Sequence, residues 1–226
     1  MISSRTYHSL HLDIATYDSS RIAYILLPEK LSDDELCKLQ EISERFEANI
    51  VVITGMDWDS DMTPWKAPGL KDGQFAGHAS YFLEKLKGDV FFNLEISLRI
   101  TKPQRYLIGT SLSGLFAFWA AIKEPLFKGV ASISGSFWYE GYTEWLERQD
   151  DFKCTRFHVS LGDKEKESKN KRLALVEEET IKAVETMLSK GLDVSFEMTE
   201  GGHFSPIVPR MEKSLNSLLY NQCING

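Results

Sequence analysis

The chain has 226 residues, and its 26 Lys and Arg against 33 Asp and Glu give a formal net charge of −7. This balance argues against a nucleic-acid-binding protein, because the neutralisation of phosphates requires clustered Lys and Arg. A composition with 42% hydrophobic and 26% charged residues is typical of a globular protein and excludes disorder as the dominant state. The length fits one large domain over residues 1–226, with ample room for a buried core.

The sequence predicts neither a membrane span nor a secretion signal. No stretch approaches the ~20 apolar residues that span a bilayer, and the N-terminus has no apolar segment typical of a signal peptide. The three cysteines, Cys37, Cys154 and Cys223, are far apart and form no CxxC pair, which argues against a disulfide framework or a zinc site. We therefore expect a cytoplasmic protein that binds no membrane and needs no metal or other cofactor.

Short apolar runs bounded by turn residues alternate with longer segments of helical periodicity. The expected strands lie within residues 21–28, 49–55, 105–109, 129–135, 157–162 and 193–199. The expected helices cover about residues 32–46, 77–98, 112–123, 169–190 and 207–220. Continuous apolar strands between amphipathic helices predict an α/β fold of three layers, with a mostly parallel sheet covered on both faces. A weaker alternating pattern at the N-terminus predicts an antiparallel edge.

In such sheets, ligands bind where the carboxyl ends of strands lead into helices. The segment that begins at Arg105 reads as strand, sharp turn and helix, with Ser111 at the turn. This is the context of a nucleophile elbow, in which a serine hydroxyl is raised above the sheet beside a helix N-terminus. We expect Ser111 to be the nucleophile, and the backbone N–H of Leu112 to stabilise an oxyanion.

The elbow departs from the usual pattern G-x-S-x-G in one position. Ser113 replaces the last glycine, and Gly114 follows one place later. A serine is small enough for a tight turn, so we interpret the segment as a variant elbow. The alternative is an ordinary βα loop in which a serine only caps the helix.

A serine nucleophile needs a base, and His203 is in the right place to supply it. It lies between the last predicted strand and the last predicted helix, in a loop with Gly201 and Gly202. In α/β-hydrolase topology the chain order is Ser, then acid, then His, with the His after the last strand. The other histidines, in the N-terminal edge, before the elbow or within a strand, fit this position less well: His8, His11, His78 and His158.

The acid should follow the strand before that of His203. Asp163, Glu165 and Glu167 all stand after the strand-ending Gly162, and one of them would hold the imidazole in the correct tautomer. Their spacing from Gly162 makes Glu165 the first choice and Asp163 the second. The alternative is a solvated loop in which none of these charges has a specific role.

With these residues in order, most of the chain resembles the putative-esterase branch of the α/β-hydrolase superfamily, which includes esterase D-like, enterochelin-esterase-like and feruloyl-esterase-like enzymes. The stretches that carry the resemblance are the elbow at 107–117, the S-x-S-x-W segment at 131–139, the D-x-T-P…F-x-G stretch at 61–77, the acid loop at 160–165 and the histidine loop at 200–205. The branch often has its acid three residues after a glycine, which supports Glu165. The resemblance implies an α/β-hydrolase sandwich and a serine esterase that acts on a small-molecule ester through an acyl-enzyme.

Two departures from the branch stand out. It usually has Asp-Gly after the strand before the first long helix, where a backbone N–H completes the oxyanion hole. Here the residues are Leu27-Pro28-Glu29-Lys30, and proline has no N–H to donate, so a neighbour must serve or the donor is missing. The N-terminal part is also short, which predicts a sheet without the full set of leading strands.

Aromatic residues concentrate near the expected mouth of the site, and about half of them should belong to the core. They are Trp58, Trp65, Phe137, Trp138, Tyr139, Tyr142 and Trp145. We expect Trp138 and Trp65 to line the substrate pocket and to suit an aromatic, acyl or siderophore-like ester. Two other functions stay open: a non-catalytic binding protein of the same fold, and an acyltransferase or peptidase that uses the same triad.

Overall fold

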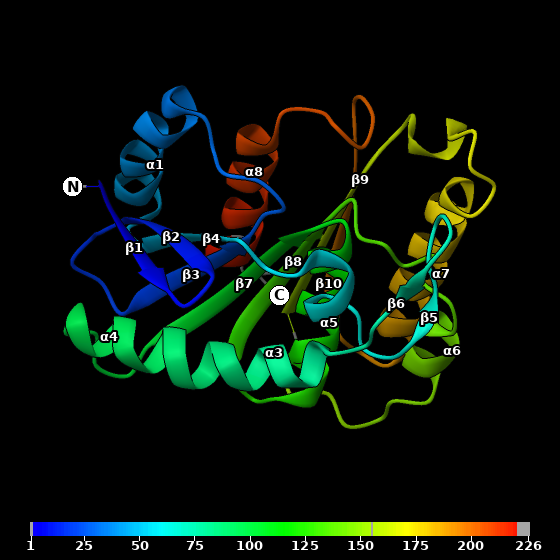
Figure 1. Cartoon of the computed structure of the whole chain (residues 1–226), viewed down its shortest axis with the longest axis horizontal. Coiled ribbons are helices and arrows are strands. Elements are labelled where there is room, and N and C mark those ends of the chain that lie inside the picture. Colours follow the sequence, from blue (N-terminus) through cyan, green and yellow to red (C-terminus); the bar gives the residue numbers. More distant parts are fainter. Residues whose placement is uncertain (1, 155, 221–226) are drawn as a thin grey trace, which may run out of the picture.

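The computed structural model describes residues 2–154 and 156–220, and its centre is an eight-stranded sheet in the order β1-β2-β4-β3-β7-β8-β9-β10 (Figure 1). The strands are β1 (Ile2–Tyr7), β2 (Leu10–Ala15), β3 (Arg21–Leu26), β4 (Asn49–Thr54), β7 (Gln104–Thr110), β8 (Phe127–Ile133), β9 (Arg156–Gly162) and β10 (Asp193–Thr199). Neighbouring strands from β4 to β10 run parallel, while β2 is antiparallel to both β1 and β4. The predicted mostly parallel α/β sheet is confirmed.

The N-terminal edge is antiparallel, as its alternating pattern predicts. The expectation that leading strands are missing is wrong, because a tight turn at His8 and Ser9 folds this short segment into two paired strands. His8 adopts a positive φ of 55°, which lets the chain reverse within two residues.

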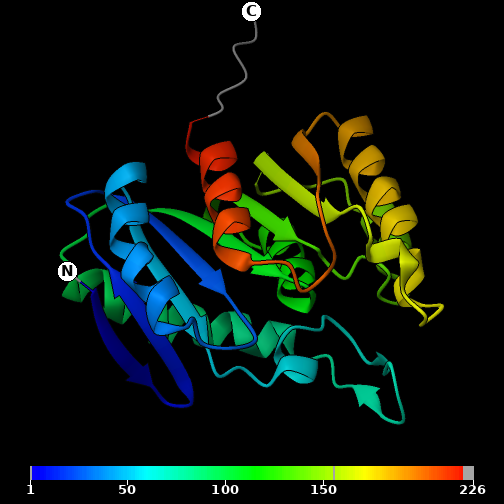
Figure 2. The ribbon, with the colours of Figure 1, turned by 90° about the horizontal axis from the view of Figure 1, so that it is seen from above.

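Helices cover both faces of the sheet (Figure 1). They are α1 (Asp33–Phe46), α2 (Trp58–Asp61), α3 (Ala79–Lys85), α4 (Asn93–Ser97), α5 (Leu112–Lys123), α6 (Tyr142–Glu147), α7 (Val176–Ser189) and α8 (Ile207–Leu219). Helices α1 and α8 lie side by side on one face (Figure 2), and α3, α5 and α7 pack into the core on the other. The three predicted layers are therefore present.

Each central strand serves both cores, which explains its continuous apolar sequence. In β3, Ile22, Tyr24 and Leu26 face the core under α3 and α5. Ala23 and Ile25 face the core under α1 and α8. Helix α1 begins after Ser32, whose hydroxyl accepts the N–H of Glu35 while the Glu35 carboxylate accepts the N–H of Ser32. This reciprocal capping satisfies two N–H groups of the first turn.

Two expected helices differ in detail. The helix expected at 77–98 contains a π-helical segment, Leu86–Phe92, between α3 and α4. The helix expected at 169–190 begins only at Val176, after two short 3-10 turns at Glu165–Glu167 and Leu173–Leu175. A two-stranded hairpin, β5 (Ala67–Pro68) and β6 (Gln74–Phe75), was not expected.

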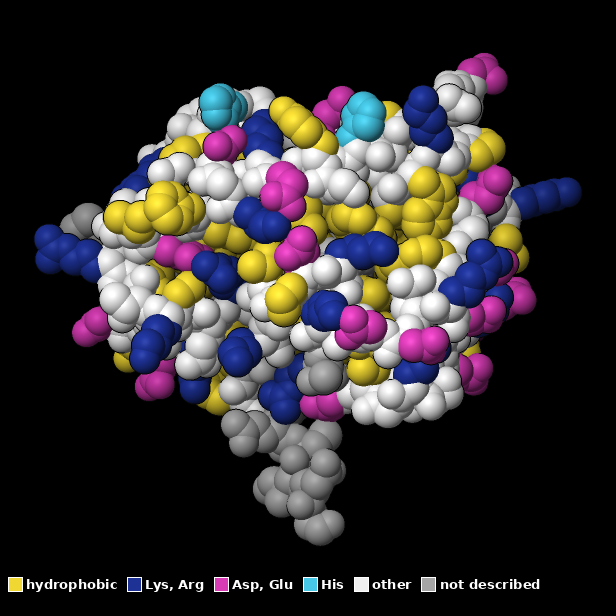
Figure 3. Space-filling model, turned by 90° about the horizontal axis from the view of Figure 1, so that it is seen from below, with side chains coloured by type: hydrophobic (Ala, Val, Ile, Leu, Met, Phe, Trp, Pro, Cys, Tyr) yellow, Lys and Arg dark blue, Asp and Glu magenta, His cyan; other side chains and the backbone are white. Residues whose placement is uncertain are grey.

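The outer side of the long helix that α3, the π-helical segment and α4 form carries exposed apolar side chains, Tyr81, Phe92 and Ile96. Figure 3 views the molecule from this side and shows apolar side chains scattered among charges of both signs. Within residues 2–154 and 156–220, no helix is long and apolar enough to cross a membrane.

The sheet register aligns the strand ends that lead to the predicted site. Leu26 in β3 pairs with Gly109 in β7, which pairs with Ser132 in β8. Further along, Thr199 in β10 pairs with Gly162 in β9. The loops after β7, β8, β9 and β10 therefore emerge at the same edge of the sheet.

Candidate active site

Ser111 stands between the end of β7 and the start of α5, with φ 56° and ψ −124°. Such a conformation is strained for a residue with a side chain and is typical of functional turns. The turn needs its flanking glycine at position 109, where an added Cβ would lie 2.0 Å from the backbone oxygen of Ser113. The local sequence thus folds into the strand–turn–helix that the motif predicts.

Ser113, which replaces the last glycine of the usual elbow pattern, is fully buried. Its hydroxyl accepts the backbone N–H of Thr110 at 2.8 Å and lies 2.8 Å from the carbonyl oxygen of Leu26. The hydroxyl therefore links the elbow to the neighbouring strand β3. A Cβ on the next residue, Gly114, would lie 2.5 Å from Ser132 Oγ, so the glycine one place later gives the close contact between α5 and β8.

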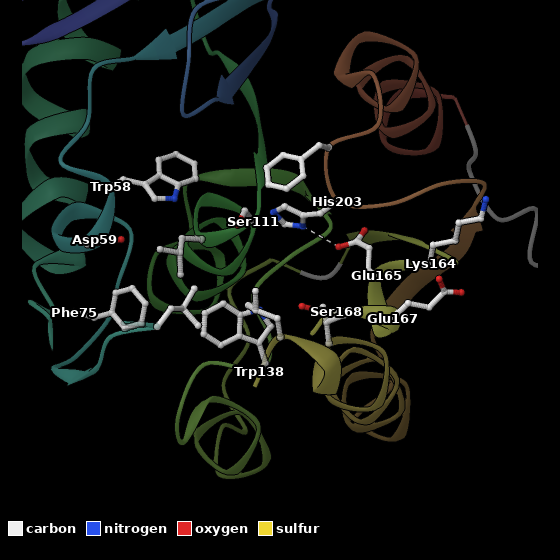
Figure 4. Close-up of a pocket in the computed structure, with 15 residues that line it drawn as sticks. Trp58, Asp59, Phe75, Ser111, Trp138, Lys164, Glu165, Glu167, Ser168 and His203 are labelled. Atoms are coloured by element: carbon white, nitrogen blue, oxygen red, sulfur yellow. Dashed lines mark hydrogen bonds and ion pairs between the residues drawn. The ribbon is translucent and has the colours of Figure 1, made fainter. Parts of the chain in front are cut away.

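His203 and Glu165 are in contact. His203 Nδ1 lies 2.8 Å from Glu165 Oε2 (Figure 4). The other oxygen, Oε1, accepts the backbone N–H of Gly162 at 2.8 Å and the hydroxyl of Ser134. Burial alone would raise the pKa of Glu165, but the hydrogen bonds from His203, Ser134 and Gly162 outweigh it and hold this pKa below its ordinary value. The carboxylate is thus stabilised in its charged form beside the imidazole.

The other two carboxylates of the acid loop have different positions. Asp163, the second choice, accepts the backbone N–H of Gly201 at 2.9 Å and so ties the acid loop to the histidine loop. Glu167 lines the cavity beside Ser111. Of the three candidates, the structure brings Glu165 to His203.

Two polar residues behind Glu165 were not among the predicted site residues. Ser134, just after β8, is fully buried and has a φ of 50°. Arg210, on α8, is also buried, and its Nη2 donates to Ser134 Oγ and lies 3.7 Å from Glu165 Oε1. A signal for Arg210 exists in the sequence, because it stands four residues before Ser214 and eight before Leu218, on the buried side of an amphipathic helix.

Ser111 and His203 line the same cavity, and Ser111 Oγ lies 3.4 Å from Ser136 Oγ. The backbone N–H of Ser136 donates to the carbonyl oxygen of Ser111 at 3.1 Å. Among the described residues, no hydrogen bond joins Ser111 Oγ to the imidazole of His203. Such contacts are often long without substrate and tighten when it binds.

Leu112, the expected oxyanion donor, is the first residue of α5 and lines the cavity. The second donor is not supplied by the two residues after β3. The N–H of Leu27 already donates to the carbonyl oxygen of Ile53 at 3.0 Å, and Pro28 has none. The first backbone N–H beyond them is that of Glu29.

The cavity at Ser111 has a volume of about 570 Å³. Its apolar wall is formed by Trp58, Leu70, Phe75, Leu112, Trp138, Leu173, Val176 and Phe204. Trp138 lies in this wall, with the guanidinium of Arg172 5.5 Å from its ring centroid. Phe204 is 98% exposed at the rim, and its ring lies edge-on to that of His203 at 5.2 Å.

The structure does not place Trp65 in the cavity wall, contrary to expectation. Its ring packs against Tyr139, Tyr142 and Trp145, and its Nε1 donates to the carbonyl oxygen of Glu140 at 2.9 Å. These contacts hold it in an aromatic cluster outside the cavity. Trp58 and Phe75 reach the wall instead (Figure 4).

No cluster of three or more His, Cys, Asp or Glu suited to a metal ion occurs in the described part of the chain.

The strand order, together with a serine elbow after the fifth sheet strand in chain order, defines the fold of an α/β-hydrolase. The family model described as Putative esterase matches residues 37–206, more than half of the chain, and the chain belongs to this family.

Known structures share this fold. An IroE-like serine hydrolase from Shewanella oneidensis superposes with a TM-score of 0.80 at 20% identity, over 97% of this chain and 80% of that one. The siderophore hydrolase EstB from Aspergillus nidulans gives a TM-score of 0.70 at 16% identity, over 99% and 95%. An uncharacterized protein of Bacillus subtilis, YbbA, is 34% identical over 111 residues, a match that spans 46% of this chain and only 44% of the relative.

Proposed function

We propose that the protein is a serine esterase that hydrolyses a carboxylic ester of a small molecule through an acyl-enzyme. The observation that carries this proposal is the contact between His203 Nδ1 and the buried Glu165 carboxylate, beside Ser111 in one apolar cavity. A carboxylate that accepts Nδ1–H leaves Nε2 of the imidazole free to act as the base. Membership of the Putative esterase family supports the same activity.

In this mechanism Ser111 Oγ attacks the ester carbonyl carbon while His203 Nε2 takes the hydroxyl proton. The carbonyl oxygen becomes an oxyanion, which accepts the N–H of Leu112 at the positive end of α5. The intermediate collapses, the alcohol leaves with the proton from His203, and Ser111 keeps the acyl group. Water activated by His203 then attacks this acyl-enzyme, which releases the acid and restores Ser111.

The cavity supports an ester with an apolar or aromatic group. A volume of about 570 Å³ lies within the usual range of small-molecule sites. Trp58, Phe75 and Trp138 offer flat apolar surfaces for such a group. Because one similar structure is described as a siderophore hydrolase, a siderophore-like ester with an aromatic group belongs among the first compounds to test.

We also propose the cytoplasm as the site of action, which the cysteine spacing supports.

The test compares wild type with Ser111→Ala on p-nitrophenyl acetate, butyrate and octanoate. We expect hydrolysis by wild type, and its loss in a variant whose circular dichroism spectrum is unchanged. Equal rates for the two proteins would contradict Ser111 as the nucleophile. Where hydrolysis depends on Ser111, the preference of wild type among the three esters shows which length of acyl chain the cavity accepts.

A second candidate function is a binding protein without turnover. The proline after β3 favours it, since removal of one oxyanion donor typically lowers turnover by about 10²–10³-fold. Labelling of Ser111 by a fluorophosphonate separates the two functions. A reactive Ser111 supports the esterase, and an inert Ser111 in a folded protein supports the binding protein.

A further inference from the structure

A buried chain of polar contacts runs from α8 to the acid of the proposed triad. Arg210 Nη2 donates to Ser134 Oγ, and the Ser134 hydroxyl donates to Glu165 Oε1. Glu165 Oε2 in turn contacts His203. These contacts connect α8, the residue after β8, the loop after β9 and the loop after β10.

The burial of Arg210 carries a cost in free energy, because a charged side chain is removed from water. Only 5% of the residue is exposed, and its Nε has no hydrogen-bond partner among the described residues. An apolar side chain would pack in that row of α8 without the desolvation of a charge. Among the described residues, the Arg210 guanidinium pairs with the carboxylate of Glu165. The position of Arg210 is therefore better explained by its interaction with the Glu165 carboxylate than by helix packing.

Ser134 is unusual for a different reason. Its φ of 50° is unfavourable for a residue with a side chain, and its N–H is held by the carbonyl oxygen of Ser160 at 2.7 Å. This backbone conformation places the hydroxyl between Arg210 and Glu165. Strain of this kind persists where the surrounding structure fixes a functional group.

We propose that Arg210 and Ser134 are positioning residues for the reaction. Arg210, acting through Ser134, holds Oε1 of Glu165 so that Oε2 faces His203. The charge of Arg210 also partly offsets that of the Glu165 carboxylate beside His203. This inference rests on the proposed function.

The electrostatic part has a definite sign. Glu165 favours the protonated imidazole of His203, and Arg210 opposes it, because like charges disfavour one another. Removal of the Arg210 charge therefore raises the pKa of His203. The other charged groups around this cluster are not changed in any variant. Asp59, Lys164 and Glu167 line the cavity at Ser111, and Asp163 accepts the backbone N–H of Gly201. Glu200 and Lys213 line a small cavity beside Arg210.

The experiment titrates the imidazole of His203 by NMR in wild type and in Arg210→Met, a variant of similar length without the charge. Arg45→Met is the matched control, because Arg45 pairs with Glu212 at the surface. We expect the His203 pKa to rise by about half a unit or more in Arg210→Met, a typical size for the loss of one nearby charge, and to stay unchanged in Arg45→Met. An unchanged or lowered value in Arg210→Met would overturn the electrostatic part.

Kinetics on a p-nitrophenyl ester test the positioning part. We expect Arg210→Met and Ser134→Gly, which keeps the backbone conformation, to lower kcat about tenfold with KM changed less than about threefold. The acid limb of kcat/KM should move to higher pH in Arg210→Met and less in Ser134→Gly. Unchanged kcat in both variants would overturn the proposal.

Arg210→Lys keeps the charge and serves where Arg210→Met does not fold. It should keep the wild-type acid limb, and a shift as large as that expected for Arg210→Met would count against the proposal. Since the NMR titration needs no turnover, it also separates the two hypotheses. Absence of Ser111-dependent hydrolysis defeats the proposed function, whereas an unmoved His203 titration defeats the electrostatic role of Arg210.

Discussion

The hydroxyl of Ser113 lies 2.8 Å from the carbonyl oxygen of Leu26, so the elbow at Ser111 is fastened to the neighbouring strand by a side chain that the usual glycine would lack. The same hydroxyl accepts the N–H of Thr110 at 2.8 Å. The departure from the G-x-S-x-G pattern is therefore accommodated within the fold.

Replacement of Ser113 by Ala should destabilise the protein. The methyl group leaves the N–H of Thr110 without its partner in a partly buried turn, which costs about 1–3 kcal/mol. The measurement is urea unfolding at pH 7, with the exposed Ser80→Ala on α3 as control. Equal unfolding free energies for Ser113→Ala and the control would show that the contact is not stabilising.

Glu165→Gln should reduce kcat about 10²–10⁴-fold with little change in KM. A neutral amide can no longer stabilise the imidazolium, and it favours the wrong tautomer of His203. Asp163→Asn is the matched variant, since the Asp163 carboxylate accepts a backbone N–H from Gly201, whereas the Glu165 carboxylate contacts the imidazole. We expect it to keep kcat within about threefold, and a larger loss from Asp163→Asn than from Glu165→Gln would reverse the assignment.

The central strands could be predicted from the sequence because each of them is apolar on both sides. Ile22 and Ala23, for example, enter different cores, which gives the continuous pattern of a buried parallel strand. Ser111, Glu165 and His203 could be placed because each of them follows the end of one of these predicted strands. The contact between Glu165 and His203 needed the structure, since three carboxylates follow β9 and only backbone geometry decides which one turns inward.

Other features could not be predicted because they depend on tertiary contacts. Trp65 and Trp138 are both tryptophans in the predicted aromatic set, but Trp65 packs against Tyr142 and Trp145, outside the cavity. The hairpin of β5 and β6 has two residues in each strand, too few to show a period of two.

Folding stability should depend on pH through His158, a buried residue outside the proposed site. Burial lowers the pKa of His158 from 6.5 to about 4, and its Nε2 has no partner among the described residues. The unfolded chain therefore binds a proton at a pH where the folded chain does not. The stabilisation is complete above about pH 6.5 and is lost as the pH falls toward 4, by up to about 3 kcal/mol.

His158→Asn, which can keep a contact with Ser195 and does not titrate, tests this dependence by urea unfolding at several pH values. Between pH 6.5 and 4 the variant should lose less unfolding free energy than wild type. The exposed His8→Asn should behave as wild type. Parallel curves for wild type and His158→Asn would rule out a contribution from His158.

Phe204 should determine which esters bind and contribute little to folding. Its side chain is 98% exposed on the rim of the cavity, next to His203, so nothing in the folded chain covers its ring. Phe204→Ala should keep the unfolding free energy within about 0.5 kcal/mol. It should raise KM for p-nitrophenyl octanoate about three- to tenfold, because apolar area is no longer buried on binding, and leave KM for the acetate unchanged. Tyr81→Ala removes an exposed ring on α3, outside the residues that line the cavity, and is the control. An equal change in KM for both esters, or the same change in Tyr81→Ala, would show that Phe204 does not contact the acyl chain.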